Sequence, residues 1–135
     1  MSKLKKTERA QLKQKFGGHC ACCGCVLGDK WHADHIENVD RKIEFCPKRG
    51  LKSSSEMNRP ELDTIENMNP ACASCNISKH SMSLDTWRKI LEDTNRKLFA
   101  YVKNYRLAVA FGQIQETPKP IVFWFEKYQA QEASQ

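Results

Sequence analysis

Two C-x-x-C pairs, Cys20-Ala21-Cys22-Cys23 and Cys72-Ala73-Ser74-Cys75, stand far apart in this chain. The dipeptide Asp34-His35 lies between them, and Asn76 directly follows the second pair. One such pair supplies two thiolates from a tight turn, and zinc takes four of them in a tetrahedron. The two pairs therefore predict a structural zinc site that ties together the ends of the segment between them.

The first cluster can be read in two ways, because Cys20/Cys23 and Cys22/Cys25 both have the required spacing. We favour Cys20/Cys23, since Gly24 follows that pair and can adopt the left-handed conformation that turns amides toward thiolates. Val26, after Cys25, cannot do so cheaply. The ligands predicted for zinc are the end members of the two pairs, Cys20, Cys23, Cys72 and Cys75.

Two other interpretations of the cysteines were weighed. Buried free cysteines are one, but two pairs at metal-ligand spacing rarely arise by accident. A redox C-x-x-C is the other, but no thioredoxin-like βαβ pattern surrounds either pair. We expect Cys22, Cys25 and Cys46 to be small core or surface thiols.

Charge is uneven along the chain of 135 residues, which has a net charge of +6 and a pI of about 9.0. Such a length fits one domain, and a metal would compensate for its modest core. A basic arm of the kind found at the start usually indicates nucleic acid, whereas a solvated helix is the plainer interpretation. Against Glu8 alone, the arm carries Lys3, Lys5, Lys6, Arg9, Lys13 and Lys15.

The composition also bears on the compartment. The sequence has no apolar run near the ~20 residues of a membrane helix and no signal-peptide pattern at its start. Its seven cysteines, an odd number, suit reduced thiols and metal better than a disulfide framework. We therefore expect a cytoplasmic protein.

Periodicity and turn residues predict the following elements. Residues 3–16 should form a basic helix that ends at Gly17-Gly18, and residues 30–37 a short strand or extended loop. Residues 46–63, rich in Ser, Gly and Pro, read as a loop. Two helices should follow, over about 71–80 and from 83 to about 105, and then a short buried strand at 121–125.

A second metal site is predicted beside the zinc. Asp34 and Asn76 offer hard oxygen ligands suited to Mg²⁺, and zinc would hold their two segments close together. His35 carries an imidazole, which can take a proton near neutral pH, and Lys79 could hold a phosphate. Adjacent strand residues point to opposite faces, so Asp34 and His35 can serve one site only where the strand ends, bends or bulges.

At these residues the chain resembles the HNH endonucleases, a ββα-metal family. Over roughly residues 16–80 it shows the zinc knuckle, Ala33-Asp34-His35-Ile36, a central Asn67 and Cys75-Asn76-Ile77-Ser78-Lys79. Small phage-encoded nucleases of this family are similar in size. The resemblance implies a metal-dependent nuclease acting on DNA, expected to be double-stranded, in a bacterial or phage-infected cell.

The resemblance also implies a role for each matched residue. His35 would be the general base, Asp34 and Asn76 would bind a catalytic Mg²⁺ or Mn²⁺, Asn67 would orient the His35 loop, and Lys79 would contact DNA phosphate. His32 is the main rival of His35. Two features depart from the family pattern: Asn38 where Pro is common, and a long segment from Lys48 to Ile65 in place of a Gly-rich turn.

The fold expected from all this is α+β, with a small zinc-stabilised ββα-metal core over residues 19–82. Residues 1–18 would form the basic arm, and 83–135 a C-terminal helix and short strand packed as part of one domain. A zinc-stabilised DNA-binding module without catalysis is the runner-up, and a protein-interaction zinc module is third. Neither alternative explains Asp34, His35, Asn67 and Asn76 together.

Overall fold

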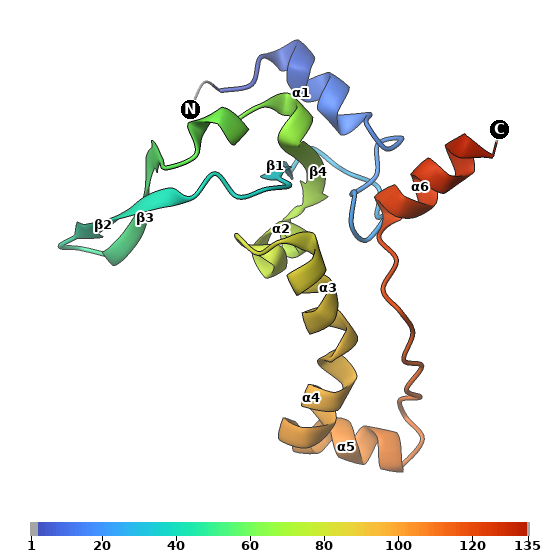
Figure 1. Cartoon of the computed structure of the whole chain (residues 1–135). Coiled ribbons are helices and arrows are strands. Elements are labelled where there is room, and N and C mark those ends of the chain that lie inside the picture. The colour runs from blue at the N-terminus through green and yellow to red at the C-terminus, as the bar shows by residue number, and fades with distance from the viewer. Residues whose placement is uncertain (1–2, 135) are drawn as a thin grey trace. The chain divides into compact units, whose positions relative to one another are not determined.

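The computed structural model describes residues 3–134 and shows a small α+β fold (Figure 1). Within these residues lie six α-helices, two short 3-10 helices and two antiparallel sheets of two strands each. The chain forms two compact units, one of residues 3–83 with 123–134 and the other of Leu84–Val122. None of the helices described has the length and apolar character needed to cross a membrane.

The basic N-terminal segment forms helix α1, Lys6–Lys13. Leu12 and Phe16 are buried, and the turns after the helix carry Gly17 and Gly18 at positive φ. These φ values of 70° and 82° favour glycine, which has no Cβ to clash. The helix is shorter than the predicted residues 3–16, but the chain turns at Gly17-Gly18 as expected.

The sheet beneath α1 pairs β1, Trp31–His35, with β4, Met68–Cys72. Four of the five β4 residues are buried, and helix α2, Ala73–Lys79, follows β4 without a loop. The sulfur of Cys72 accepts a hydrogen bond from the amide of Cys75 at 3.5 Å and so caps α2. One of the cysteines predicted to bind zinc therefore lies at the junction of β4 and α2.

Two cations of the basic arm fasten α1 to this sheet. The Arg9 guanidinium donates to the carbonyl of Trp31 at 2.7 Å and lies 4.0 Å from the centre of its ring. Lys15 Nζ donates to the carbonyl of Met68 and to Oδ1 of Asn69, and burial lowers the pKa of Lys15. Part of the basic arm is thus structural.

The segment expected to be a loop, 46–63, is mostly ordered. Strand β2, Arg41–Cys46, pairs with β3, Gly50–Met57, in a hairpin with a bulge near Arg41. The 3-10 helices η1, Pro60–Leu62, and η2, Ile65–Asn67, then lead to β4. The prediction of a loop was therefore wrong. Gly50, at φ 72°, helps to close a tight turn, and residues 53–55, the serine run, belong to strand β3.

The C-terminal segment also differs from expectation. Residues 121–125 form no strand, and helix α6, Trp124–Ala133, begins within them. Phe123 is buried, its amide is capped by the Glu126 carboxylate at 2.9 Å, and its ring stacks near Phe125. A short aromatic run fits a strand or a helix equally well, and the N-terminal cap decides for the helix here.

The second unit contains helices α3, Leu84–Glu92, α4, Thr94–Tyr101, and α5, Lys103–Ala110. The sequence predicted one long helix to about residue 105. Val102 is extended instead (φ −114°, ψ 101°), and the Arg106 guanidinium binds the carbonyls of Phe99 and Ala100 at the end of α4. The carbonyls at the end of α4 therefore have hydrogen-bond partners although the helix does not continue.

Candidate functional site

Four cysteine sulfurs lie close together in the first unit. The sulfur atoms of Cys20, Cys23, Cys25 and Cys72 all lie within 4.8 Å of one another, and those of Cys23 and Cys72 are 3.8 Å apart. Zinc–sulfur bonds of about 2.3 Å in a tetrahedron place sulfurs about 3.8 Å from one another. The cluster can therefore hold a metal ion such as zinc with little movement.

This set shares three members with the predicted ligands and has Cys25 where the sequence predicted Cys75. The Cys75 side chain hydrogen-bonds with Cys20 and Cys72, so it borders the same cluster. Cys25 is exposed and Cys75 half-buried. Both candidates for the fourth ligand are thus within reach of one ion.

Crowding of the thiols shifts their pKa values in opposite directions. Hydrogen bonds from Cys22 and Cys75 hold the pKa of Cys20 well below that of an ordinary thiol. Hydrogen bonding to Cys20 raises the pKa of Cys75, and partial desolvation together with hydrogen bonding to Cys23 raises the pKa of Cys25 to about 12. One thiolate suppresses ionisation of its neighbours, and a bound divalent cation offsets that repulsion.

The cysteine knuckle, residues 20–24, is hydrogen-bonded to β4 and to α6. The Ala21 amide donates to the carbonyl of Pro70 in β4 at 2.8 Å, and the Trp124 amide of α6 donates to the carbonyl of Cys22 at 3.0 Å. Gly24 has φ 79°, and a Cβ there would come within 2.6 Å of the Trp124 ring. The glycine singled out from the sequence is therefore needed both for the turn and for the packing of α6.

A pocket of about 510 Å³ lies beside β1 and α2. Asp34, His35 and Asn76 all line it, although the first two are neighbours on one strand. Strand β1 ends at His35, and the next amide, that of Ile36, donates to the carbonyl of Asn67. The end of the strand thus lets both side chains border one space.

Asp34 is buried and paired with Lys79. Lys79 Nζ lies 3.1 Å from Asp34 Oδ2 and donates to the carbonyl of His35, also at 3.1 Å. Burial raises the pKa of the Asp34 carboxyl, and the Lys79 ammonium opposes the rise. Lys79 is only 2% exposed, so the expected contact with a DNA phosphate does not fit its position. It neutralises a site carboxylate instead.

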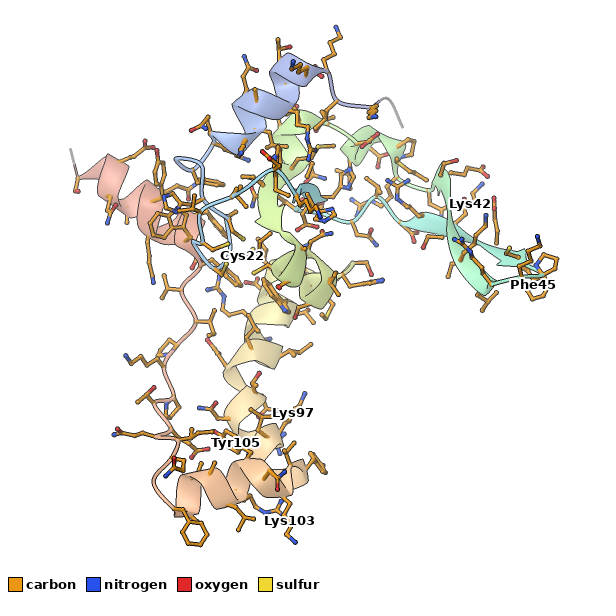
Figure 2. All side chains as sticks on the ribbon, turned by 180° about the vertical axis from the view of Figure 1, so that it is seen from behind. Cys22, Lys42, Phe45, Lys97, Lys103 and Tyr105 are labelled. Carbon is orange, nitrogen blue, oxygen red and sulfur yellow. The ribbon has the colours of Figure 1, made fainter. Side chains whose placement is uncertain are left out.

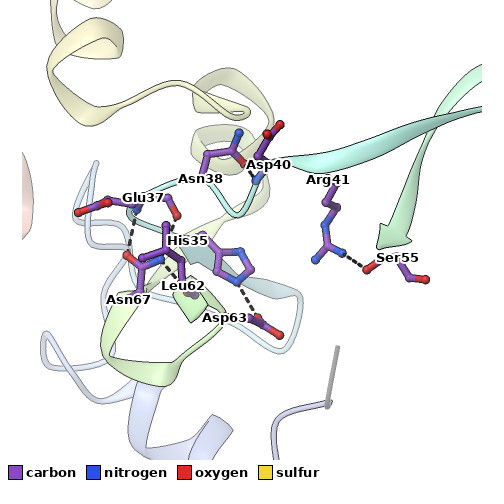
Figure 3. Close-up of polar contacts among 9 residues, drawn as sticks. All are labelled: His35, Glu37, Asn38, Asp40, Arg41, Ser55, Leu62, Asp63 and Asn67. Atoms are coloured by element: carbon purple, nitrogen blue, oxygen red, sulfur yellow. Dashed lines mark hydrogen bonds and ion pairs between the residues drawn. The ribbon is translucent and has the colours of Figure 1, made fainter. Parts of the chain in front are cut away.

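His35 is held by Asp63, a residue that the sequence did not single out. His35 Nε2 lies 2.8 Å from Asp63 Oδ1, and the two side chains are only 14% and 11% exposed (Figure 3). With the proton on Nε2, the other ring nitrogen is left as the acceptor. A carboxylate so placed fixes the orientation of the ring and stabilises positive charge on it.

Asn67 fixes the chain that follows His35. Its Oδ1 accepts from the Glu37 amide at 3.0 Å, and its Nδ2 donates to the carbonyls of Glu37 and Leu62 at 2.9 and 2.8 Å (Figure 3). One side chain thus joins the segment after β1 to the segment before η2. This is the geometry of a residue that orients the His35 loop without entering the pocket.

Backbone strain gathers at the pocket as well. Among the described residues, Asp40 and His80 are the two non-glycine residues at positive φ, 54° and 52°, and both line the pocket. Strained backbone of this kind is typical of functional sites. By contrast His32, the rival of His35, is exposed and lies outside the residues that line the pocket.

Comparison of the chain with protein-family models, curated proteins and solved structures gives no match.

Proposed function

We propose that this protein is a metal-dependent DNA endonuclease of the HNH kind, with the β1–β4 sheet and α2 as its ββα-metal core. One observation carries the proposal: Asp34, His35 and Asn76 line one pocket, and Asp63 holds the imidazole. A buried carboxylate, an amide, an oriented histidine and a basic chain together suit hydrolysis of a phosphodiester.

The residues fit a hard divalent cation by donor type, since a carboxylate and an amide oxygen border the same space. Asp34 and Asn76 would hold Mg²⁺ or Mn²⁺, and Lys79 would balance the charge of Asp34 at its other contact. When bound, such an ion supplies Lewis-acid stabilisation of charge that develops on the phosphate oxygens. Zinc in the cysteine cluster would be structural.

In the proposed reaction His35 takes a proton from the attacking water, and Asp63 stabilises the imidazolium that forms. The water attacks phosphorus in line with the 3′ oxygen, which leaves with the bonding electron pair and gains a proton. The products are 5′-phosphate and 3′-hydroxyl ends. One site of this kind cuts one strand.

Conversion of supercoiled plasmid to nicked circle tests the proposal. We expect nicking with Mg²⁺ or Mn²⁺ that is lost in EDTA, and a fall of about 10²–10⁴-fold in His35→Ala. The matched control is His32→Ala, an exposed histidine on the same strand, which should nick at the parental rate.

Two outcomes would contradict the proposal. One is a folded, zinc-loaded His35→Ala protein that nicks as fast as the parent. The other is a parent protein that shifts duplex DNA in a salt-sensitive manner but never nicks it, which identifies the zinc-stabilised binding module instead.

A further inference from the structure

The β2–β3 hairpin exposes large apolar side chains instead of burying them. Ile43 is 68% exposed, Phe45 72% and Leu51 76%. Phe45 and Leu51 are cross-strand partners, so their side chains form one apolar pair near the turn. Figure 2 shows Phe45 at the tip of the hairpin. An exposed apolar pair on an isolated ribbon is typical of a surface that contacts something.

The charge around this pair selects the partner. Glu44 is the one acidic residue between positions 41 and 52. Lys42 pairs with Glu56 and Arg41 donates to the carbonyl of Ser55, so these two stiffen the ribbon. Lys52 lies opposite Glu44 in the strand register, on the other face of the ribbon from Phe45 and Leu51. The remaining two basic residues, Lys48 and Arg49, are exposed at the turn. Cations around an apolar pair complement a nucleic acid, which offers phosphates and base surfaces together.

The base of the hairpin borders the candidate site. Arg41, Ile43 and Ser53 line the same pocket as Asp34, His35 and Asn76, and the hairpin extends away from it (Figures 1 and 2). A strand rises about 3.4 Å per residue, so the turn lies roughly 15 Å beyond Ile43. A duplex with one phosphate in the pocket would therefore run beside the ribbon.

We propose that the β2–β3 hairpin is a ribbon that binds in a groove of duplex DNA, with Lys48 and Arg49 on phosphates and Phe45–Leu51 against the bases. This inference rests on the proposed function for the position of the DNA. A two-stranded ribbon fits the major groove, which is about 12 Å wide. The long segment between β1 and β4 thus serves as the DNA-binding part of the protein.

Binding to a fluorescent duplex tests the ribbon, measured by anisotropy in a His35→Ala background so that the DNA is not cut. Lys48→Ala/Arg49→Ala should weaken binding about 10-fold or more and reduce the slope of log K against log salt by about 2. The matched control removes two exposed lysines of the second unit, Lys103→Ala/Lys119→Ala, with the same change in net charge. Equal affinity and equal slope in the two double variants would overturn the proposal.

The apolar pair is tested separately by Phe45→Ala, which should weaken duplex binding about fivefold or more. Sedimentation of the parent and of Phe45→Ala without DNA tests whether the hairpin contacts a second copy of the chain instead. A parent that dimerises, with Phe45→Ala monomeric but unchanged in DNA affinity, makes the hairpin a self-association surface and overturns the inference.

Nicking assays on the parent and on hairpin variants that keep His35 separate this inference from the proposed function. A parent that nicks, with hairpin variants that bind and nick like the control, refutes the ribbon and keeps the nuclease. A parent that binds through the hairpin but does not nick refutes the nuclease and keeps the ribbon.

Discussion

The first unit contains two antiparallel ribbons that are alike in secondary structure and opposite in environment. In β1–β4, Trp31, Asp34 and four successive residues of β4 are buried, and α1 and the cysteine knuckle bind to it. In β2–β3, Ser54 alone among the strand residues is buried. The comparison shows that strand pairing by itself says little about what a ribbon does.

The difference follows from what each ribbon is anchored to. A lone two-stranded hairpin is marginally stable in water, so a ribbon needs other support. The β1–β4 ribbon has the cysteine cluster at one end, where Cys72 ends β4. The β2–β3 ribbon has its own cross-strand contacts, such as Lys42 with Glu56. The first ribbon is therefore held by packing and by the cluster, whereas the second depends mainly on its own strand pairs.

The largest effect should come from removing the anchor of the buried ribbon. Cys20→Ser replaces a buried sulfur of the cluster and should abolish zinc binding and folding of the first unit, because structural zinc contributes about 10 kcal/mol or more. Zinc content and thermal unfolding followed by near-ultraviolet circular dichroism measure this.

Cys46→Ser is the matched control on the exposed ribbon, and it should keep one zinc per chain and the parental melting temperature. If Cys20→Ser keeps both its zinc and its fold, the cluster is not the anchor and the contrast between the ribbons needs another cause.

The next effect compares one aromatic side chain from each ribbon. Trp31 in β1 is 6% exposed and Phe45 in β2 is 72% exposed. Trp31→Ala should lower the free energy of unfolding by about 3–5 kcal/mol, whereas Phe45→Ala should stay within about 0.5 kcal/mol. Denaturant unfolding of the zinc-loaded proteins gives both values, and similar losses would show that the hairpin is packed in solution.

Local signals in the sequence were enough to predict the anchored part. The cysteine spacing predicted the cluster, although the set observed includes Cys25 rather than Cys75. Apolar spacing with Gly17-Gly18 predicted α1 and its end, and the region of β1 was expected to be extended. In each case the deciding signal is a short local pattern, as it is within each of the two C-x-x-C pairs.

Features that depend on distant parts of the chain were missed. Ile43 and Phe45 alternate with charged residues in β2, but the partner strand β3 carries the run Ser53-Ser54-Ser55 in place of such a pattern, so the sequence did not reveal the pairing. Lys79 was expected to contact a DNA phosphate, and only the fold reveals that its ammonium meets Asp34. Asp63 belongs to no motif, and its contact with His35 depends on how the whole segment from β2 to η2 folds back.

The smallest effect tests whether residues 58–67, the segment between β3 and β4, help to orient His35 at the end of β1. Asp63→Asn keeps the shape of the side chain but removes the charge that faces His35. We expect kcat for nicking to fall about 10- to 100-fold, less than in His35→Ala, because the base remains while its orientation and charge stabilisation weaken.

Glu61→Gln is the matched control, an exposed acid two residues earlier that pairs with Arg59 at 3.8 Å. It should leave kcat unchanged. A purely structural role for Asp63 would lower the amount of folded protein but leave kcat of the folded fraction at the parental value. That outcome would show that the buried ribbon positions His35 without Asp63.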